Sequence, residues 1–242
     1  FSSVSGQYKA IVAKDKLYRR VESDVTLLNE RASLGAPRPV QSRATVTWKS
    51  DAVSAPLRGV IAIGCSLGGM DALFTLLAQL IRSTSELAGI TYSILITQHV
   101  AILPVKEAEE GETILPGTVY LAPADYHLLL NEDWTLALCC DERDNYSRPS
   151  INVMFESVAE VCGSRAIGVL MTGANEDGAR GLAAIQTAGG FTIVQDPKDA
   201  VAAVMPEAGI KLIRPDRILP IAAIASAIQA QLQKSAGAAD RP

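Results

Sequence analysis

The chain has 242 residues, of which 48% are hydrophobic, 20% charged and 5% aromatic. Apolar content at this level can bury a core that offsets the loss of chain entropy, so a disordered chain and a mini-protein fold are both excluded. The apolar runs fall far short of the roughly 18 residues that suggest a membrane span. The composition therefore predicts a soluble globular protein without a transmembrane segment, built from one large domain with or without a small appendage.

The charges are distributed unevenly along the chain. Residues 1–57 hold nine Lys and Arg against five Asp and Glu, a net charge of +4, whereas residues 58–242 hold thirteen against twenty-one, a net charge of −8. An acidic body argues against a nucleic-acid partner, because such binding depends on clustered cations that displace phosphate counterions.

The metal-binding and redox residue types show no ligand pattern. The two histidines, His99 and His127, lie far apart in the sequence, and no two cysteines have CxxC spacing. The sequence therefore predicts no metal site and no cofactor. We expect reduced thiols in a cytoplasmic protein, and we interpret the acidic stretch Glu107–Glu112 as a solvated loop. The four cysteines are Cys65, Cys139, Cys140 and Cys162.

The first quarter of the chain differs in character from the rest. Residues Tyr8–Arg31 repeat apolar side chains at three- and four-residue spacing, which predicts an amphipathic helix. Residues Ala32–Leu57 are rich in Ala, Ser and Pro and predict a linker with a short strand at Thr45–Trp48. We expect residues 1–57 to form a helical extension and linker, and residues 58–242 to form the main domain.

The main domain alternates short β-rich runs with helical patterns. The predicted strands cover Gly59–Ile63, Tyr92–Thr97, Thr118–Ala122, Ala166–Thr172 and Phe191–Gln195, with a hairpin of His127–Leu130 and Thr135–Cys139. The predicted helices cover Gly69–Ile81, Asn152–Cys162, Gly178–Ala188 and Ile221–Gln233. This alternation predicts an α/β fold of the doubly wound, Rossmann-like kind, with a mainly parallel sheet and helices on both faces. The functional site should lie at the carboxyl ends of the strands.

A candidate nucleophile follows the first of these strands. The run Gly64-Cys65-Ser66-Leu67-Gly68-Gly69 fits G-x-S-x-G, in which small residues expose a serine hydroxyl on a sharp turn. The amides that follow it at a helix N-terminus can stabilise an oxyanion. A glycine turn that only packs helix on strand, or that cradles a phosphate, is the alternative. A dinucleotide site fits less well, because the run lacks G-x-G-x-x-G spacing and no acidic residue ends the second strand.

The serine needs a base and an orienting acid. His99 follows the buried strand Tyr92–Thr97 and so reaches the same sheet edge as Ser66, whereas His127 opens a hairpin strand and is better explained as an ordinary packed or surface histidine. The turn after Ala166–Thr172 supplies Glu176 and Asp177. An N-cap is the alternative role for Asp177. The order Ser, His, Asp differs from the α/β-hydrolase order, in which histidine comes last.

Several segments of the main domain together resemble the bacterial chemotaxis protein-glutamate methylesterases. They are IGCSLGG (63–69), ITQHV (96–100), PGTVYLAPADYHLLL (116–130), RPSINVMFESVAE (148–160), GVLMTGANEDGARGL (168–182) and AGGFTIVQDPKDAVAAVMPEAGI (188–210). The resemblance implies a serine hydrolase that removes methyl esters from glutamate side chains of methyl-accepting chemoreceptors, often with deamidation of receptor glutamines. It maps the catalytic triad to Ser66, His99 and Asp177, without a cofactor.

The chain departs from this family at identifiable positions. Cys65 and Leu67 stand where members usually have Ala and Thr, and Ala174 replaces the methionine of a GMG turn, although the backbone amides of Leu67 and Ala174 remain available to bind an oxyanion. The family's longer segment after the histidine does not follow His99, so either a substrate-facing loop is absent or the printed sequence omits it. Residues 1–57 are too short for the family's N-terminal phosphorylation-receiver domain, so this extension is a candidate site for a regulatory partner.

Two other functions fit the same sequence. A catalytically silent receptor-binding or scaffold module would keep the fold and lose the chemistry, which the changes at Leu67 and Ala174 would accommodate. A small-molecule serine esterase would keep the chemistry and change the substrate. Methanol release from a methylated receptor, compared with turnover of a simple p-nitrophenyl ester, distinguishes all three.

Overall fold

The computed structural model describes residues 58–84, 92–96 and 105–239. The predicted helix at Tyr8–Arg31 and the predicted strand at Thr45–Trp48 lie outside these residues. Seven strands form one sheet in the order β3-β4-β2-β1-β7-β8-β9, and every neighbouring pair is parallel. These strands are β1 (Gly59–Gly64), β2 (Tyr92–Ile96), β3 (Val105–Glu107), β4 (Val119–Leu121), β7 (Ala166–Leu170), β8 (Phe191–Gln195) and β9 (Arg217–Leu219).

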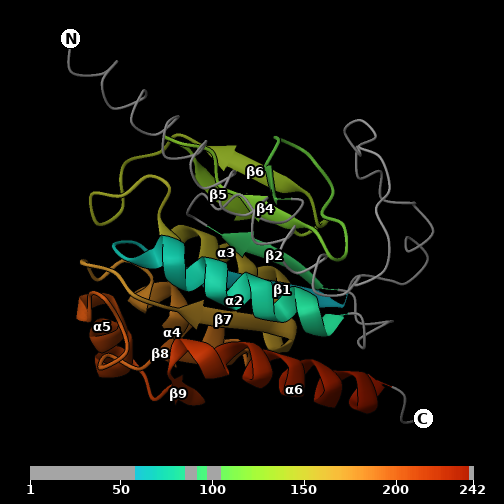
Figure 1. The fold of residues 1–242 in the computed structure, drawn as a ribbon. Coiled ribbons are helices and arrows are strands. Elements are labelled where there is room, and N and C mark those ends of the chain that lie inside the picture. The colour runs from blue at the N-terminus through green and yellow to red at the C-terminus, as the bar shows by residue number, and fades with distance from the viewer. Residues whose placement is uncertain (1–57, 85–91, 97–104, 240–242) are drawn as a thin grey trace, which may run out of the picture. The chain divides into compact units, whose positions relative to one another are not determined.

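Helices cover both faces of this sheet (Figure 1). One face carries α2 (Gly69–Thr84) and α6 (Ile221–Ala239), and the other carries α3 (Ile151–Cys162), α4 (Ala179–Thr187) and α5 (Val204–Leu212). A separate antiparallel hairpin of β5 (His127–Leu130) and β6 (Leu136–Cys139) packs beside α3. The predicted doubly wound α/β fold with one hairpin is therefore confirmed.

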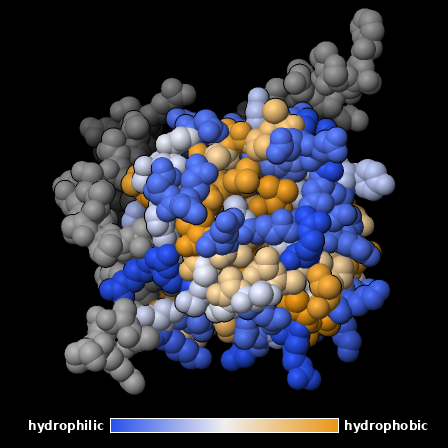
Figure 2. Space-filling model, turned by 180° about the vertical axis from the view of Figure 1, so that it is seen from behind, coloured by the Kyte–Doolittle hydropathy of each residue, from blue (hydrophilic) through white to orange (hydrophobic). Residues whose placement is uncertain are grey.

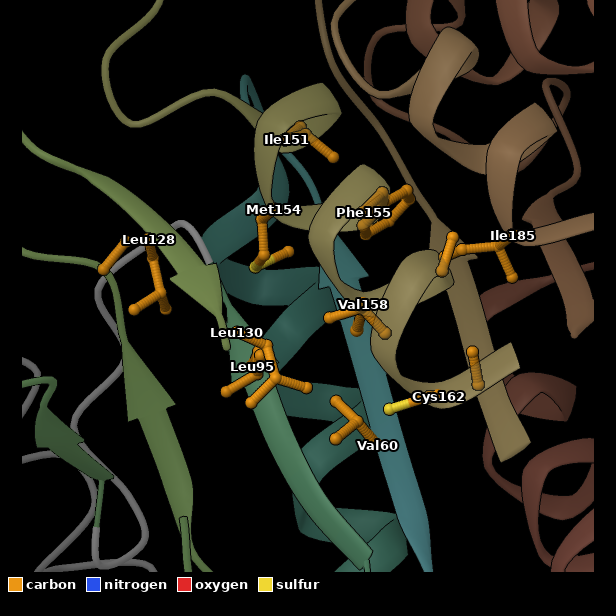
Figure 3. Packing of buried hydrophobic residues seen from close by; sticks show 14 of the residues in the cluster. Val60, Leu95, Leu128, Leu130, Ile151, Met154, Phe155, Val158, Cys162 and Ile185 are labelled. Carbon is orange, nitrogen blue, oxygen red and sulfur yellow. The ribbon is translucent and has the colours of Figure 1, made fainter. Parts of the chain in front are cut away.

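Helix α3 forms the centre of the core on its face of the sheet (Figure 3). Its apolar residues recur at helical spacing, so one side of the helix is buried against β1, the hairpin and α4. Five side chains on this side are almost inaccessible to solvent: Ile151, Met154, Phe155, Val158 and Cys162. The Ser150 side chain accepts a hydrogen bond from the Val153 amide and so caps the start of the helix. This packing fixes the N-terminus of α3 at the edge of the sheet where β1 and β7 end.

The structure also contains elements that the sequence patterns did not predict. Strands β3 and β9 have three residues each, too few to show an alternating pattern. Helix α5 contains Pro206 in its first turn and Gly209 in its interior, both of which normally argue against a helix. Pro206 is tolerated because amides in the first turn have no partner within the helix. A Cβ atom at Gly209 would lie 2.9 Å from Leu170 Cδ2, so glycine lets the helix approach β7 closely.

The surface facing the viewer in Figure 2 shows apolar residues interrupted by hydrophilic ones. Among the described residues, no helix combines the length and the apolar character needed to cross a membrane.

Candidate active site

The site lies where the sheet changes its direction of winding. Strands β1 and β7 are neighbours, but the chain continues from β1 toward β2 on one side and from β7 toward β8 on the other. The loops that follow β1 and β7 therefore separate, which opens a crevice at their carboxyl ends. Two hydrogen bonds hold the strand ends together, from the Met171 amide to the Gly64 carbonyl and from the Ser66 amide to the Thr172 carbonyl, both 2.9 Å.

Ser66 occupies the tight turn between β1 and α2. The Gly69 amide donates to the Ser66 carbonyl at 2.8 Å, and Gly68 has a left-handed φ of 78°, which glycine adopts without strain. A Cβ atom on Gly68 would also collide with the Val201 side chain. Ser66 is half-buried, and the neighbouring Leu67 side chain is exposed. The turn thus presents the serine at the start of a helix, as the sequence predicted.

Two backbone amides at this edge are available as donors. Within the described ranges, neither the Leu67 amide nor the Ala174 amide donates to an acceptor. The loop that carries Ala174 is held on its N-terminal side, because the Gly173 amide donates to the Ala202 carbonyl and the Gly173 carbonyl accepts from the Met205 amide, both at 3.0 Å. These are the two amides that we predicted from the sequence to be available for binding an oxyanion.

Asp177 is held by the N-terminus of α3. Its Oδ1 accepts hydrogen bonds from the Ser150 hydroxyl (2.9 Å) and the Asn152 amide (3.0 Å), and its Oδ2 accepts one from the Ile151 amide (2.8 Å). The side chain is only 2% exposed. Burial raises the pKa of this carboxyl group, and the three hydrogen bonds partly oppose that rise. Since each carboxylate oxygen can accept two hydrogen bonds, Oδ2 retains one free acceptor position.

Ser66 and Asp177 line the same cavity, which has a volume of about 300 Å³. Its lining is Cys65, Ser66, Arg143, Ser147, Arg148, Pro149, Ile151, Asn175, Asp177 and Met205. Glu176 lines a different cavity, together with Arg180 and Lys211. The two adjacent acidic residues therefore face different surroundings, and only Asp177 shares a cavity with the serine.

His127 has a structural role. Its ring is 1% exposed, its Nδ1 accepts from the Ser150 amide at 3.2 Å, and its Nε2 lies 3.1 Å from the Glu142 carbonyl. Since a carbonyl can only accept, these contacts define a neutral imidazole with its proton on Nε2. Both ring nitrogens are occupied, and His127 does not line the cavity that contains Ser66. The interpretation of His127 as a packed histidine agrees with this environment.

His99 lies outside the described residues. The structure describes the strand that precedes it, and Ile96, the last residue of β2, pairs with Ile63 of β1. The chain therefore leaves β2 three residues before His99, at the same sheet edge as the Ser66 turn. The role of His99 stays a prediction.

The thiol next to the serine does not compete with it as a nucleophile. Cys65 is 2% exposed, and burial raises the pKa of its thiol to about 12. The reactive form of cysteine is the thiolate, so Cys65 stays unreactive near neutral pH. All four cysteines are free.

The acidic stretch Glu107–Glu112 is mostly exposed, as predicted, but Glu107 is the last residue of strand β3 and does not belong to a loop. Glu109 and Glu112 both form ion pairs with Lys106. In the described part of the chain, no group of three or more His, Cys, Asp or Glu residues could hold a metal ion.

Sequence reasoning missed two residues at this site. Ser150 binds Asp177 and caps α3, and Arg148 lines the cavity. A serine directly before an amphipathic run is a recognisable N-cap signal, so the capping role of Ser150 was accessible from the sequence. Its contact with Asp177 and the position of Arg148 depend on the packing of α3 against the loop after β7, which no local pattern encodes.

The fold and this cavity define a doubly wound α/β protein with a serine and a buried aspartate at its switch point, a site suited to hydrolytic chemistry. The CheB methylesterase family model matches residues 61–228, and the chain belongs to this family. The Thermotoga maritima CheB methylesterase catalytic domain, a crystal structure, superposes with a TM-score of 0.64 at 28% identity, covering 72% of this chain and 98% of that domain.

Named relatives agree with this assignment. A putative protein-glutamate methylesterase/protein-glutamine glutaminase of Leptospira interrogans is 42% identical over 180 residues, covering 68% of this chain and 90% of the relative. A protein-glutamate methylesterase/protein-glutamine glutaminase of Bordetella parapertussis is 34% identical over 234 residues, covering 89% of this chain and 64% of the relative. The similarity thus extends over most of the chain.

Proposed function

We propose that this protein hydrolyses methyl esters on glutamate side chains of chemoreceptors in the cytoplasm and acts by a serine mechanism. The observation that carries the proposal is the shared cavity of Ser66 and Asp177 at the switch point of a CheB-family fold. The names of the relatives also pair this esterase activity with a glutaminase activity. Deamidation of receptor glutamines is accordingly part of the proposal.

In the proposed reaction, Ser66 is the nucleophile and His99 is the general base. Asp177 orients His99 through the free acceptor position on Oδ2 and stabilises the imidazolium that forms. The Leu67 and Ala174 amides bind the oxyanion. Methanol leaves with the proton that His99 took from Ser66, and a water molecule activated by His99 then hydrolyses the acyl-enzyme.

The test is Ser66→Ala, measured as methanol release from a methylated receptor. The half-buried serine sits in a turn and contributes little to the core, so we expect the variant to fold and to lose up to about a millionfold in turnover. A folded variant that keeps more than about a tenth of the activity would exclude Ser66 as nucleophile.

The same assay separates the competing functions. A silent scaffold releases no methanol and turns over no p-nitrophenyl ester. A small-molecule esterase turns over the simple ester and leaves the methylated receptor intact. The assay with full-length receptor tests the receptor as substrate. A regulatory partner bound through residues 8–31 is a further part of the proposal.

A further inference from the structure

Arg148 lines the proposed active site, yet the proposed reaction gives it no task. Its side chain borders the same cavity as Ser66 and Asp177. A methyl ester is neutral, and its hydrolysis in this site uses a serine, a base and two amide donors. A guanidinium group in this cavity therefore calls for a separate explanation.

The position of Arg148 is fixed without its charge being neutralised. Its Nη1 donates to the carbonyl oxygens of Cys140 (2.7 Å) and Asp141 (3.0 Å). Carbonyl groups orient a guanidinium but carry no net charge, and no carboxylate pairs with Arg148 among the described residues. The other arginine of the cavity, Arg143, forms an ion pair with Asp125 at 3.0 Å.

One edge of the Arg148 guanidinium lacks acceptors. Its Nε is buried, and in the described ranges it is the sole buried side-chain nitrogen or oxygen without a hydrogen-bond partner. Leaving such a donor unpaired is costly, and exceptions in folded proteins call for a specific explanation. Because Nη1 is already engaged and Nε is shielded from solvent, Nη2 is the guanidinium nitrogen that an external carboxylate can reach, and it can donate a charge-assisted hydrogen bond.

We propose that Arg148 binds a carboxylate of the substrate polypeptide, on an acidic side chain next to the glutamate methyl ester. This inference rests on the proposed function and adds to it a preference for substrates with an acidic residue next to the methyl ester. Arg148 gains an acceptor for its Nη2, and its charge gains a counter-ion. The enzyme then hydrolyses esters beside a glutamate faster than esters beside a glutamine.

The test uses two peptides that carry one glutamate methyl ester and differ only in the neighbouring residue, Glu or Gln. We expect the wild-type kcat/KM from methanol release to be on the order of tenfold higher for the Glu peptide, mainly through a lower KM. Arg148→Gln should remove this preference and leave the Gln peptide within about twofold of wild type. Arg148→Lys, which keeps the charge and loses the planar guanidinium, should keep part of the preference.

The control variant is Arg165→Gln. Arg165 also donates to backbone carbonyls, those of Cys162 and Val161, but it lies at the opposite end of α3 from the cavity. This variant should keep the full preference for the Glu peptide. Loss of the preference in Arg165→Gln would mean a general charge effect and would overturn the assignment to Arg148.

The remaining outcomes are decisive as well. Equal rates on the two peptides with the wild-type protein would overturn the inference. Equal slowing of both peptides by Arg148→Gln would place Arg148 in the reaction itself and would also overturn it. If the wild-type protein releases no methanol from the methylated receptor or from either peptide, the proposed function fails. Calorimetric binding of the two unesterified peptides to the Ser66→Ala protein then tests the carboxylate site alone. Tighter binding of the Glu peptide supports the site, and binding of free glutamate as tightly as that peptide contradicts it.

Discussion

Asp177 places an ionisable carboxyl group where water has little access. The N-terminus of α3 partly offsets this cost, because the Ile151 and Asn152 amides and the Ser150 hydroxyl all point at the carboxylate. An arrangement of this kind holds the carboxylate in one orientation before substrate arrives. It suits a residue that must orient a histidine and stabilise the charge that forms on it.

The first prediction compares the two neighbouring acids. Asp177→Asn should lower kcat by about ten-thousandfold, because the amide favours the wrong tautomer of His99, whereas Glu176→Gln should lower it less than about tenfold. Glu176 is exposed and lines a different cavity, so its charge acts only at a distance. The measurement is steady-state kinetics on a methyl ester substrate, with circular dichroism to show that both variants fold. Equal losses of kcat in the two variants would show that both carboxylates act only through their negative charge and that neither one positions His99.

A second prediction follows from the direction of the Asp177 pKa shift. Burial raises the pKa of Asp177 in the folded protein above its ordinary value of 3.8, so the folded state holds this proton more tightly than the unfolded state. The contribution of Asp177 to stability is therefore fully present below pH 3.8 and is lost as the pH rises through the folded pKa. The free energy of unfolding of the wild type, relative to Asp177→Asn, should fall as the pH rises over this window.

Urea unfolding of both proteins at a series of pH values from about 4 to about 7 measures this difference. Groups that titrate alike in the two proteins cancel in the comparison. A difference that stays constant or grows with pH would contradict the assignment of a raised pKa to Asp177.

At the scale of elements, α3 connects the acidic turn to the core. Asn152 is 1% exposed, and its Oδ1 accepts hydrogen bonds from the Gly178 amide (2.9 Å) and the Gly181 amide (3.0 Å) at the start of α4. One side chain of α3 therefore satisfies two amides of the next helix. Because Gly178 directly follows Asp177, the same contact fixes the backbone of the acidic turn.

The third prediction is that Asn152→Ala lowers both stability and turnover. Two buried amides lose their acceptor, so the free energy of unfolding should fall by about 1–3 kcal/mol, and kcat should fall as the Asp177 turn loses its support. Ser157→Ala is the matched control, since Ser157 accepts from the buried Leu130 amide at the hairpin. The control should be destabilised without a change in kcat. If Ser157→Ala lowers kcat as much as Asn152→Ala, the loss reflects stability alone.

Local patterns predicted most of these elements and the residues at strand ends. The runs that became β1 and β7 are continuous and apolar, and those of β2 and β8 are largely so, because both faces of a parallel sheet are buried. Their order in the chain was enough to place Ser66 and Asp177 at one edge of the sheet. The same patterns did not predict α5, because Pro206 and Gly209 both have a low helix propensity and the local sequence therefore argues against a helix. Its position depends on packing against β7 and β8, which involves residues distant in sequence.

The chemistry of the acidic turn was only partly predictable for the same reason. The sequence placed two carboxylates after β7, and the resemblance to the methylesterases favoured Asp177. Which of the two faces the serine is decided by the α3 N-terminus, which comes from a segment 25 to 27 residues earlier in the chain. The role of Arg148 depends on two carbonyl groups of the preceding loop and has no sequence signature.

At the scale of the whole molecule, the described cores are built from the main domain. Both clusters of buried residues draw their members from between Val60 and Leu232. The matched Thermotoga maritima catalytic domain is covered over 98% of its length by this chain. The division into an extension of residues 1–57 and a catalytic domain of residues 58–242 remains a prediction.

The last prediction tests this division by removing residues 1–52, which leaves residues 53–57 of the extension ahead of the main domain. If the main domain holds its complete core, the shortened protein should unfold in one cooperative transition and hydrolyse a simple ester within about threefold of the full chain. Ser66→Ala in the shortened protein should abolish that hydrolysis, which shows that the same site is measured. Activity on an intact receptor should fall selectively if the predicted helix of residues 8–31 binds a partner or the receptor itself. A shortened protein that loses its cooperative transition would instead show that the first 52 residues complete the core, and the predicted domain boundary would then be wrong.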